Sequence, residues 1–419
     1  YEGHQEQRRV FGEYEPVNTK SFQNIKLLIK SSFFYCYFAT TMAVQRIHID
    51  EFLKLAETHP VFDVRSPGEY NHAHMPGAIS LPLFTDEERK QVGTAYKQIS
   101  REQAIKIGLD YFGPKMRKMV EEVEAVSSRQ LADSSRQAAV GSLPTANCIL
   151  VYCWRGGMRS GAVSWLLDMY GFKVYTLIGG YKKFRNHVLD TFKKPYRFNI
   201  IGGYTGSGKT ELLKTLKEKG EKVIDLENIA NHKGSAFGAI GLPPQPTQEM
   251  FENLLSNELS TISSKEGLRT TNYELLTSCI WLEDESQRIG LINIPGDLWK
   301  NMRQSKVWFL DIPFEERLKH IIPEYGILEQ EKLIAAIERI SQKLGHLNAK
   351  TAILLLKEGK ISESFDILLR YYDKFYFRSL HNREGLETLL HTINCKSVSP
   401  ENADLLIREA TAQSQTPLA

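Results

Sequence analysis

The sequence predicts an α/β protein with two units built on parallel sheets, followed by a helical region. Its 419 residues exceed one ordinary compact core and favour two or three domains. Two segments, 148–170 and 197–216, show an apolar strand, a glycine-rich loop and an amphipathic helix in that order. After Asp311, apolar residues recur at spacings of three and four, which is typical of helices.

The overall composition is that of a folded protein, with 42% hydrophobic and 25% charged residues. The formal net charge of +3 is too small to indicate a nucleic-acid binder by itself, so a site for a polyanion would be a local patch. Five scattered cysteines, without a Cys-x-x-Cys pair or a histidine run, argue against a disulfide framework and a zinc site. A reducing, cytoplasmic setting fits this pattern.

The first 44 residues differ from the rest of the chain. Residues 31–44 are uncharged, but they are shorter than the roughly 20 apolar residues that a spanning helix needs. Several acids precede them, which is unlike a secretory signal. We expect residues 1–44 to be a disordered or adventitious extension, and no association with a membrane.

The first predicted unit covers residues 45–192 and carries a cysteine in a loop. A strand ending at Asp63 is followed by a helix start, and a second apolar strand stops at Cys153. The helix after the loop is expected to end at Gly171. Backbone N–H groups, the positive helix end, Arg155 and Arg159 would all stabilise a thiolate, so Cys153 is the predicted nucleophile. The alternative is a small buried hydrophobic residue at a strand end.

Two histidines, His72 and His74, flank the turn that follows the first strand. A chemical role as bases is one interpretation, whereas turn histidines more often contact backbone or solvent.

The second predicted unit, residues 193–320, carries a phosphate-binding loop. The segment from Gly203 to Thr210 has the spacing Gly-x4-Gly-Lys-Thr between an apolar strand and an amphipathic helix. Its N–H groups wrap an anion, the lysine adds a cation, and the threonine hydroxyl reaches a metal ion. The predicted phosphate-binding residues are Gly203, Gly206, Ser207, Gly208, Lys209 and Thr210.

An acid should end a strand beside the strand that leads into this loop. Three strand-like runs end in acids, at Asp225, at Glu283 and Asp284, and at Asp311. The third strand normally neighbours the loop strand in kinase-like members of this class, so Glu283 and Asp284 are the candidates for a metal ligand or acid. Asp311 is the reserve, and solvated acids at a strand end are the alternative. Mg²⁺ would be the ion, although the sequence leaves its requirement open.

The junction between the two units is rich in basic and aromatic residues. Basic side chains bind phosphates and aromatic faces stack on unpaired bases, which would suit RNA. A solvated helix face that packs its aromatics into the core would give the same sequence pattern. The candidate RNA-binding residues are Lys182, Lys183, Arg185, Lys193, Lys194 and Arg197. Residues 225–255 are expected to form a loop facing the substrate, the alternative being a plain surface connection. Residues 321–419 are expected to be helical, with five aromatics at 371–377 mostly in the core.

The cysteine-bearing unit resembles a rhodanese domain. The resemblance rests on DVRSPGEYNHAHMPGAISLP, which starts at Asp63, and on YCWRGGMRS around Cys153. Rhodanese loops usually place the last cation five residues after the cysteine, whereas Arg159 lies six after it, which suits a phosphate or selenophosphate. Cysteine phosphatases share this longer spacing but have a histidine before the cysteine, where this chain has Tyr152.

The order of the two units narrows the resemblance further. GGYKKFRNHV, GGYTGSGKT, DLENIANHKGSAFG, WLEDESQRIG and YYDKFY resemble the tRNA 2-selenouridine synthase family, roughly from Met42 to the low 390s. The resemblance implies a transferase that geranylates wobble 2-thiouridine on sulfur and then replaces sulfur by selenium. It implies tRNA as partner, a selenophosphate synthase as supplier, selenophosphate and geranyl diphosphate as co-substrates, and no tightly bound cofactor.

Within this interpretation, each loop is assigned to one step of the reaction. Cys153, Arg155 and Arg159 are assigned to the selenium step, and the loop from Gly203 to Thr210 to geranyl diphosphate. Both centres are expected to act on the same extruded base. The alternatives are a rhodanese sulfurtransferase fused to a small-molecule kinase or NTPase, a cysteine phosphatase, and a non-catalytic adaptor.

Overall fold

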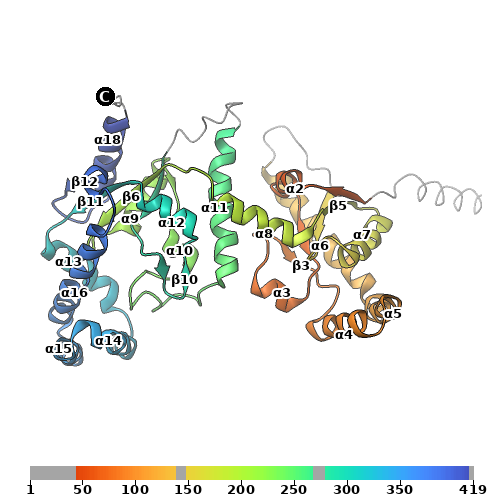
Figure 1. Ribbon diagram of the computed structural model, residues 1–419, viewed down its shortest axis with the longest axis horizontal. Helices are drawn as coiled ribbons and strands as arrows, with labels where there is room; N and C mark the ends of the chain where they lie inside the picture. The colour runs from red at the N-terminus through yellow and green to blue at the C-terminus, as the bar shows by residue number, and fades with distance from the viewer. Residues whose placement is uncertain (1–43, 138–147, 268–278, 415–419) are drawn as a thin grey trace, which may run out of the picture.

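The computed structural model describes residues 44–137, 148–267 and 279–414, arranged as two lobes, each around a five-stranded parallel sheet (Figure 1). The expected extension, residues 1–43, lies outside the described residues. This architecture confirms the predicted fold class, with two α/β units and a helical region near the C-terminal end.

The sheet of the first lobe has the order β1-β5-β4-β2-β3, with every neighbouring pair parallel. Its strands are β1 (Gln45–Ile47), β2 (Val61–Asp63), β3 (Ile79–Ser80), β4 (Cys148–Tyr152) and β5 (Lys173–Leu177). Its helices are α2 (Ile49–Ala56), α3 (Pro67–His72), α4 (Asp86–Gln98), α5 (Arg101–Phe112), the 3₁₀ turn η1 (Gly113–Lys115), α6 (Met116–Gln137), α7 (Met158–Tyr170) and α8 (Gly180–Thr191).

Strand β4 explains why this sheet is covered on both faces. All five of its residues are buried, and they alternate between two cores. Ile149 and Val151 pack with side chains of α5, α6 and α7, whereas Leu150 and Tyr152 pack with side chains of α2 and α8. Helix α7 ends as predicted at Gly171, which adopts a left-handed conformation with φ of 117°.

The sheet of the second lobe has the order β12-β11-β6-β8-β7 and is also fully parallel. Its strands are β6 (Phe198–Gly203), β7 (Lys222–Val223), β8 (Ile280–Glu283), β11 (Lys306–Asp311) and β12 (Leu390–Asn394), and a separate ribbon pairs β9 (Arg288–Ile289) with β10 (Ile292–Asn293). The helices around the sheet are α9 (Lys209–Glu218), α10 (Leu226–Ala230), α11 (Gln248–Gly267), α12 (Gly296–Arg303) and α18 (Asn402–Ser414). Strand β8 lies beside β6, as predicted.

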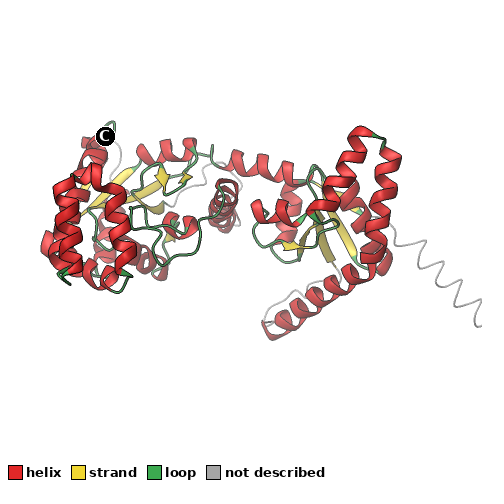
Figure 2. Ribbon diagram, turned by 90° about the horizontal axis from the view of Figure 1, so that it is seen from below, coloured by secondary structure: helices red, strands yellow, loops and turns green. Residues whose placement is uncertain are grey.

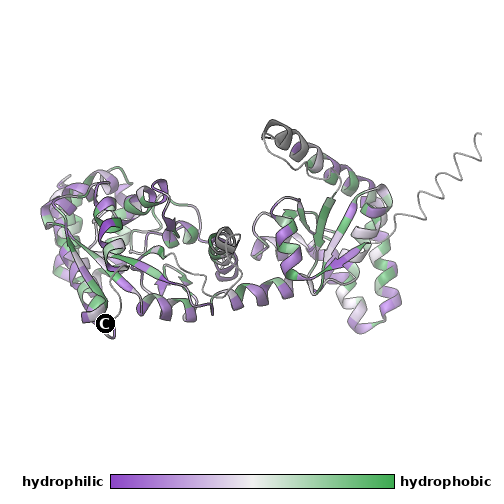
Figure 3. Ribbon diagram, turned by 90° about the horizontal axis from the view of Figure 1, so that it is seen from above, coloured by the Kyte–Doolittle hydropathy of each residue, from purple (hydrophilic) through white to green (hydrophobic). Residues whose placement is uncertain are grey.

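A block of helices follows β11 and stacks at one end of this lobe (Figures 1 and 2). It comprises α13 (Phe314–Gly326), α14 (Gln330–Leu344), α15 (His346–Lys357) and α16 (Ile361–His381), and the short α17 (Leu386–Leu389) precedes β12. Its core is a separate cluster that includes Ile337, Ala352 and Leu368, with Phe237 from the loop after α10. Figure 3 shows the alternation of polar and apolar residues along these helices.

Strand β12 differs from the expectation of an all-helical region over 321–419. It pairs in parallel with β11 along its whole length and becomes the edge of the P-loop sheet, so this sheet extends well beyond residue 320. The strand reads Leu-His-Thr-Ile-Asn, and only Ile393 is buried. An edge strand with one buried residue carries little hydrophobic signal, which is why the pattern did not indicate it.

The lobes meet through α8 and α11. Tyr181 and Phe184 of α8 share one hydrophobic core with Phe251 and Leu255 of α11, and this core reaches both sheets. In Figure 1 these helices lie between the two lobes. Among the described residues, no helix is long and apolar enough to cross a membrane.

Candidate functional site: a cysteine loop and a phosphate loop

Cys153 follows β4 at the carboxyl edge of the first sheet, and only 3% of it is exposed. Its Sγ lies 3.2 Å from the hydroxyl of Ser160 in the first turns of α7. Burial alone would raise the pKa of the Cys153 thiol. Hydrogen bonds from the Ser160 side chain and from the N–H groups of Ser160 and Gly157, together with the charge of Arg159, outweigh burial and lower it. The loop therefore stabilises a thiolate.

The two arginines of the loop differ in their surroundings. Arg159 donates to both carboxylate oxygens of Glu69 at 2.6 and 3.3 Å, and this pairing contributes to the lowered pKa of Glu69 despite its burial. Arg155 is exposed at the loop surface. An incoming anion would meet Arg155 directly, whereas Arg159 already shares its charge with a carboxylate.

The cysteine loop is packed so closely that one position requires glycine. Gly156 has φ of 66°, and a Cβ there would lie 2.5 Å from the carbonyl oxygen of Leu177. This close approach brings the loop against the end of β5.

Tyr152, the residue before Cys153, is a structural anchor. Its buried hydroxyl donates to Asp63 at 2.8 Å and accepts from the N–H of Met75. His74 stacks on Tyr70, with ring centroids 3.9 Å apart, and its Nδ1 lies 2.9 Å from the Tyr70 carbonyl. His72 is exposed, 4.0 Å from a carboxylate oxygen of Glu249.

The phosphate loop connects β6 to α9. Gly203, Gly206 and Gly208 all have positive φ, which lets the backbone curl around an anion. The Lys209 ammonium donates to the carbonyl of Gly203 at 3.0 Å and so lies across the loop. Ser207 is buried and donates to the carbonyl of Tyr204. These features are those of a phosphate cradle at a helix N-terminus.

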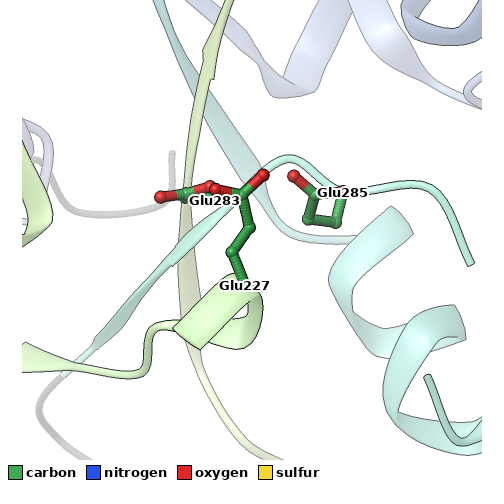
Figure 4. Close-up of side chains that lie close together, drawn as sticks. All are labelled: Glu227, Glu283 and Glu285. Atoms are coloured by element: carbon green, nitrogen blue, oxygen red, sulfur yellow. The ribbon is translucent and has the colours of Figure 1, made fainter. Parts of the chain in front are cut away.

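Three glutamates gather beside this cradle (Figure 4). Glu283 ends β8, Glu227 lies on α10, and Glu285 lies in the loop before β9. Each offers an oxygen within 4.8 Å of the others. The Thr210 hydroxyl lies 3.4 Å from Glu227.

The proximity of these carboxyl groups changes how they titrate. Burial, and then the charge of Glu285, raises the pKa of Glu227 to about 8, although Lys209 opposes the shift. Burial and the charge of Glu283 raise the pKa of Glu285 to about 8. Burial and Glu227 raise the pKa of Glu283 well above its ordinary value. The cluster therefore holds protons near neutral pH unless a cation replaces them.

These residues fit a magnesium ion, which the phosphate-loop fold implies. Mg²⁺ prefers carboxylate, hydroxyl and phosphate oxygens. Within the described part of the chain, Glu283 Oε1 is buried without a hydrogen-bond partner. Glu283, Glu227 and the hydroxyl of Thr210 would hold the ion, which would neutralise the charge of a bound diphosphate.

The other predicted acids lie elsewhere. Asp284 accepts from Arg383 at 2.6 Å and from the Tyr376 hydroxyl at 2.8 Å, so it belongs to a buried ion-pair network behind the loop. Asp311 is exposed at the end of β11, and the side chain of Asp225 caps α10. Sequence reasoning missed Glu227 and Glu285, although both lie in the DLEN and WLEDES segments that carried the family resemblance.

The predicted RNA-binding residues fall into two groups. Arg185 is half-buried and donates to Glu252 and Asn253 of α11, so it joins the lobes. Lys193 pairs with Asp190 at 2.8 Å on the surface. The exposed members of the set are Lys182, Lys183, Lys193, Lys194 and Arg197.

Residues 225–255, predicted to be a loop facing the substrate, instead contain α10 and the start of α11, and the connection between these helices lies partly against the acid cluster. A Cβ on Gly234 would lie 2.8 Å from Glu285 Oε2 and 3.2 Å from Glu227 Oε1. His232 is buried nearby, and burial lowers its pKa.

A cysteine loop that stabilises a thiolate on one parallel sheet and a phosphate loop on the other define a rhodanese-like domain joined to a P-loop domain. Two family models match these regions: a rhodanese-like domain over residues 48–187, and the AAA domain of tRNA 2-selenouridine synthase over residues 196–392. The second match extends into β12.

Known relatives cover most of the chain. The tRNA 2-selenouridine synthase of Hydrogenovibrio crunogenus is 36% identical over 356 residues, covering 78% of this chain and 90% of that protein. The tRNA 2-selenouridine synthase of Bdellovibrio bacteriovorus is 32% identical over 386 residues, covering 82% and 94% respectively. A solved N-terminal domain of a putative ATP/GTP binding protein from Clostridium difficile 630 aligns with 35% of this chain and 99% of its own, at 38% identity and a TM-score of 0.28. The chain belongs to the tRNA 2-selenouridine synthase family.

Proposed function

We propose that this enzyme converts 2-thiouridine in tRNA into 2-selenouridine in two steps, with S-geranyl-2-thiouridine as the intermediate. The observation that carries the proposal is the presence, in one chain of this family, of a thiolate-stabilising loop and a complete phosphate loop beside a cluster of three glutamates. Two phosphorylated co-substrates need two such anion-binding sites.

In the first step, the thiocarbonyl sulfur attacks the first carbon of geranyl diphosphate. A carbon–sulfur bond forms, the carbon–oxygen bond to diphosphate breaks, and the base loses its ring N–H proton. The N–H groups of the loop, Lys209 and a cation held by Glu283 would stabilise the charge that develops on the leaving diphosphate.

The surroundings of the phosphate loop support a diphosphate with an apolar substituent. A hollow of about 120 Å³ opens beside Gly208, with Leu212, Val398 and Pro400 in its lining. The polar side chains of its lining contact other protein groups. Asn402 donates to the Ser397 carbonyl, Ser399 accepts from the N–H of Glu401, and Ser207 donates to the Tyr204 carbonyl. A carboxylate oxygen of Glu211 lies 3.8 Å from Nε2 of His320. A cavity of roughly this size, 150 Å³, holds a six-carbon hydrocarbon in another protein, so this one suits about one isoprene unit.

In the second step, a selenium nucleophile attacks the ring carbon and the alkylated sulfur leaves. Selenophosphate, water and S-geranyl-2-thiouridine give 2-selenouridine, geranylthiol and phosphate. Alkylation makes sulfur a better leaving group, which explains the order of the steps. We assign this step to Cys153 and the surrounding N–H groups, with the exposed Arg155 meeting the incoming phosphate.

The exposed basic side chains at the start and after the end of α8, Lys182, Lys183, Lys194 and Arg197, are assigned to the tRNA backbone. Arg185 is left out of this surface because it binds α11, and Lys193 because it pairs with Asp190.

Purified enzyme, geranyl diphosphate and tRNA containing 2-thiouridine test the assignment of the phosphate loop. Lys209→Ala should abolish geranylation, which mass spectrometry of the nucleosides measures. An unchanged rate of geranylation would refute the assignment. Nucleotide turnover, measured with and without tRNA, tests the fused kinase or NTPase, which would consume ATP without RNA.

A further inference from the structure

The N-terminus of α8 lies directly against the Cys153 loop. The N–H of Tyr181 donates to the carbonyl of Cys153 at 2.8 Å, and the N–H of Lys182 donates to the carbonyl of Trp154 at 3.0 Å. At Gly180 a Cβ would lie 2.2 Å from the Cys153 carbonyl oxygen and 2.5 Å from the nitrogen of Gly156. Since the two segments touch through their backbones, a shift of α8 moves the loop that holds the thiol.

Tyr181 is held on its ring and at its hydroxyl. Its side chain is fully buried, and the guanidinium of Arg65 lies 3.8 Å from the ring centroid. Its hydroxyl donates to Glu249 at 2.8 Å and accepts from the side-chain amide of Asn253 at 2.8 Å. Burial raises the pKa of Tyr181, so the hydroxyl stays protonated and remains a donor. Both of its hydroxyl partners belong to α11, in the P-loop lobe.

Asn253 is the centre of this contact between the lobes. It is fully buried, and its amide also donates to the carbonyl of His74 at 2.8 Å. Its Oδ1 accepts from Arg185 at 2.5 Å. A buried amide with this many partners fixes its neighbours strongly, because an unpaired polar group in a low-dielectric interior is costly.

We propose that Tyr181 and Asn253 are positioning residues for Cys153: through them, α11 of the P-loop lobe holds the cysteine loop in the arrangement that stabilises the thiolate. The thiolate needs the N–H groups of Gly157 and Ser160 to point at Sγ. Those groups follow Gly156, which contacts both Gly180 and the end of β5. Removal of the hydroxyl contacts of Tyr181 therefore makes the loop around the Cys153 thiolate less rigid, although no atom that contacts the thiol is changed.

The start of α11 also reaches the acid cluster. Gln245, just before the helix, donates to the carbonyls of Ala230 and Ile289, both at 3.1 Å, and accepts from the N–H of Leu291 at 2.8 Å. Ala230 ends the helix that carries Glu227, and Ile289 lies four residues after Glu285. Gln245 and the chain that leads from it into α11 therefore connect the elements of the acid cluster to the contact that holds the Cys153 loop. From this connection we infer that a ligand on the phosphate loop changes the reactivity of the thiol.

Alkylation of Cys153 by iodoacetamide in the full chain, followed by mass spectrometry of the peptide that carries it, tests the positioning role. From pH 5 to 9, Tyr181→Phe should raise the thiol pKa by about one unit, which lowers the rate constant at neutral pH by up to tenfold. Tyr170→Phe is the matched control, because it removes an exposed tyrosine hydroxyl that donates to Glu124 at 2.7 Å in the same lobe. It should react like the wild type.

A pH profile of Tyr181→Phe identical to that of the wild type would overturn the positioning role. Should Tyr181→Phe fail to fold by circular dichroism, Asn253→Asp replaces it, since this isosteric change removes the donor to Tyr181 and His74 and keeps the acceptor for Arg185.

Inorganic pyrophosphate tests the link between the two sites. Saturating pyrophosphate should change the alkylation rate of Cys153 at least twofold in the wild type, and have no effect in Asn253→Asp. An unchanged rate in the wild type would overturn the link. This experiment rests on the proposed use of the phosphate loop, so calorimetry measures pyrophosphate binding in the same samples. Absence of pyrophosphate binding would count against the proposed function. Binding without a changed alkylation rate would count against the link alone.

Discussion

Glu283 and Asp284 are neighbours in the sequence, but their side chains lie in different surroundings. Successive side chains at the end of a strand point to opposite sides. Glu283 therefore faces Glu227 and Lys209 beside the phosphate loop, whereas Asp284 faces Arg383 and Tyr376. We expect the first to bind a cation and the second to stabilise the fold.

Paired substitutions test this division. Asp284→Asn should lower the free energy of unfolding by about 3 kcal/mol, because it breaks a buried pair and leaves the charge of Arg383 uncompensated. Glu283→Gln should leave the free energy of unfolding unchanged, because it relieves repulsion in a crowded carboxylate cluster. It should abolish Mn²⁺ binding, because it removes a charged ligand of the cation. Chemical denaturation and electron paramagnetic resonance of Mn²⁺ measure the two effects. If Asp284→Asn and Glu283→Gln lowered both the stability and Mn²⁺ binding to the same extent, the separate roles of the two acids would be contradicted.

Val398 tests the apolar hollow beside the phosphate loop. Val398→Thr should weaken geranyl diphosphate binding about threefold, since this uncharged and nearly isosteric change replaces an apolar methyl group of the lining by a hydroxyl. Inorganic pyrophosphate, which lacks the hydrocarbon, is the matched control ligand and should bind unchanged. Calorimetry with both ligands measures the difference. Equal weakening of both would show that Val398 supports the loop itself.

At the scale of elements, the contact between α8 and the cysteine loop depends on Gly180. Gly180→Ala should destabilise the protein by about 3 kcal/mol or more, because a Cβ would meet backbone atoms at 2.2 Å in a left-handed conformation. Gly77→Ala is the control: its φ is also positive, at 80°, but a Cβ there would have nothing within 4 Å. It should cost about 1 kcal/mol. Thermal unfolding measures both, and equal losses would contradict the packing argument.

The acid cluster brings together α10, the end of β8 and the loop before β9, and it predicts a pH dependence. The pKa values of Glu227 and Glu285, about 8, mean that both groups bind protons below that pH. A cation must displace these protons, so Mn²⁺ affinity should rise from pH 6.5 to 9 and then level off. Calorimetric titration at several pH values measures this trend. A cation affinity that stays constant over this range would contradict the shared-proton cluster.

Sequence reasoning succeeded for elements that carry a strong local pattern. The spacing of apolar residues predicted the helices that follow Asp311, and the glycine-lysine motif placed the phosphate loop between β6 and α9. Strand β12 was missed because a mostly solvent-facing edge strand lacks that pattern. Glu227 and Glu285 were missed because only the fold brings α10 next to the loop after β8.

At the scale of the whole molecule, the two sites lie in separate lobes that α8 and α11 join (Figure 1). The same junction carries the exposed lysines proposed for tRNA and the buried contacts that position Cys153. The resemblance predicted the order of the two units and their chemistry. Their joining through Arg185, Tyr181 and Asn253 could not be predicted, because it depends on side chains from α8 and α11 meeting in space.

The central claim is that the two loops perform successive steps on one tRNA nucleoside. Nucleoside mass spectrometry of tRNA from a deletion strain, complemented with this chain, tests it most directly. The wild type should restore 2-selenouridine, Cys153→Ser should accumulate S-geranyl-2-thiouridine, and Lys209→Ala should leave 2-thiouridine unmodified. Selenouridine formed at the wild-type level by either variant, with the variant protein expressed normally, would contradict the claim.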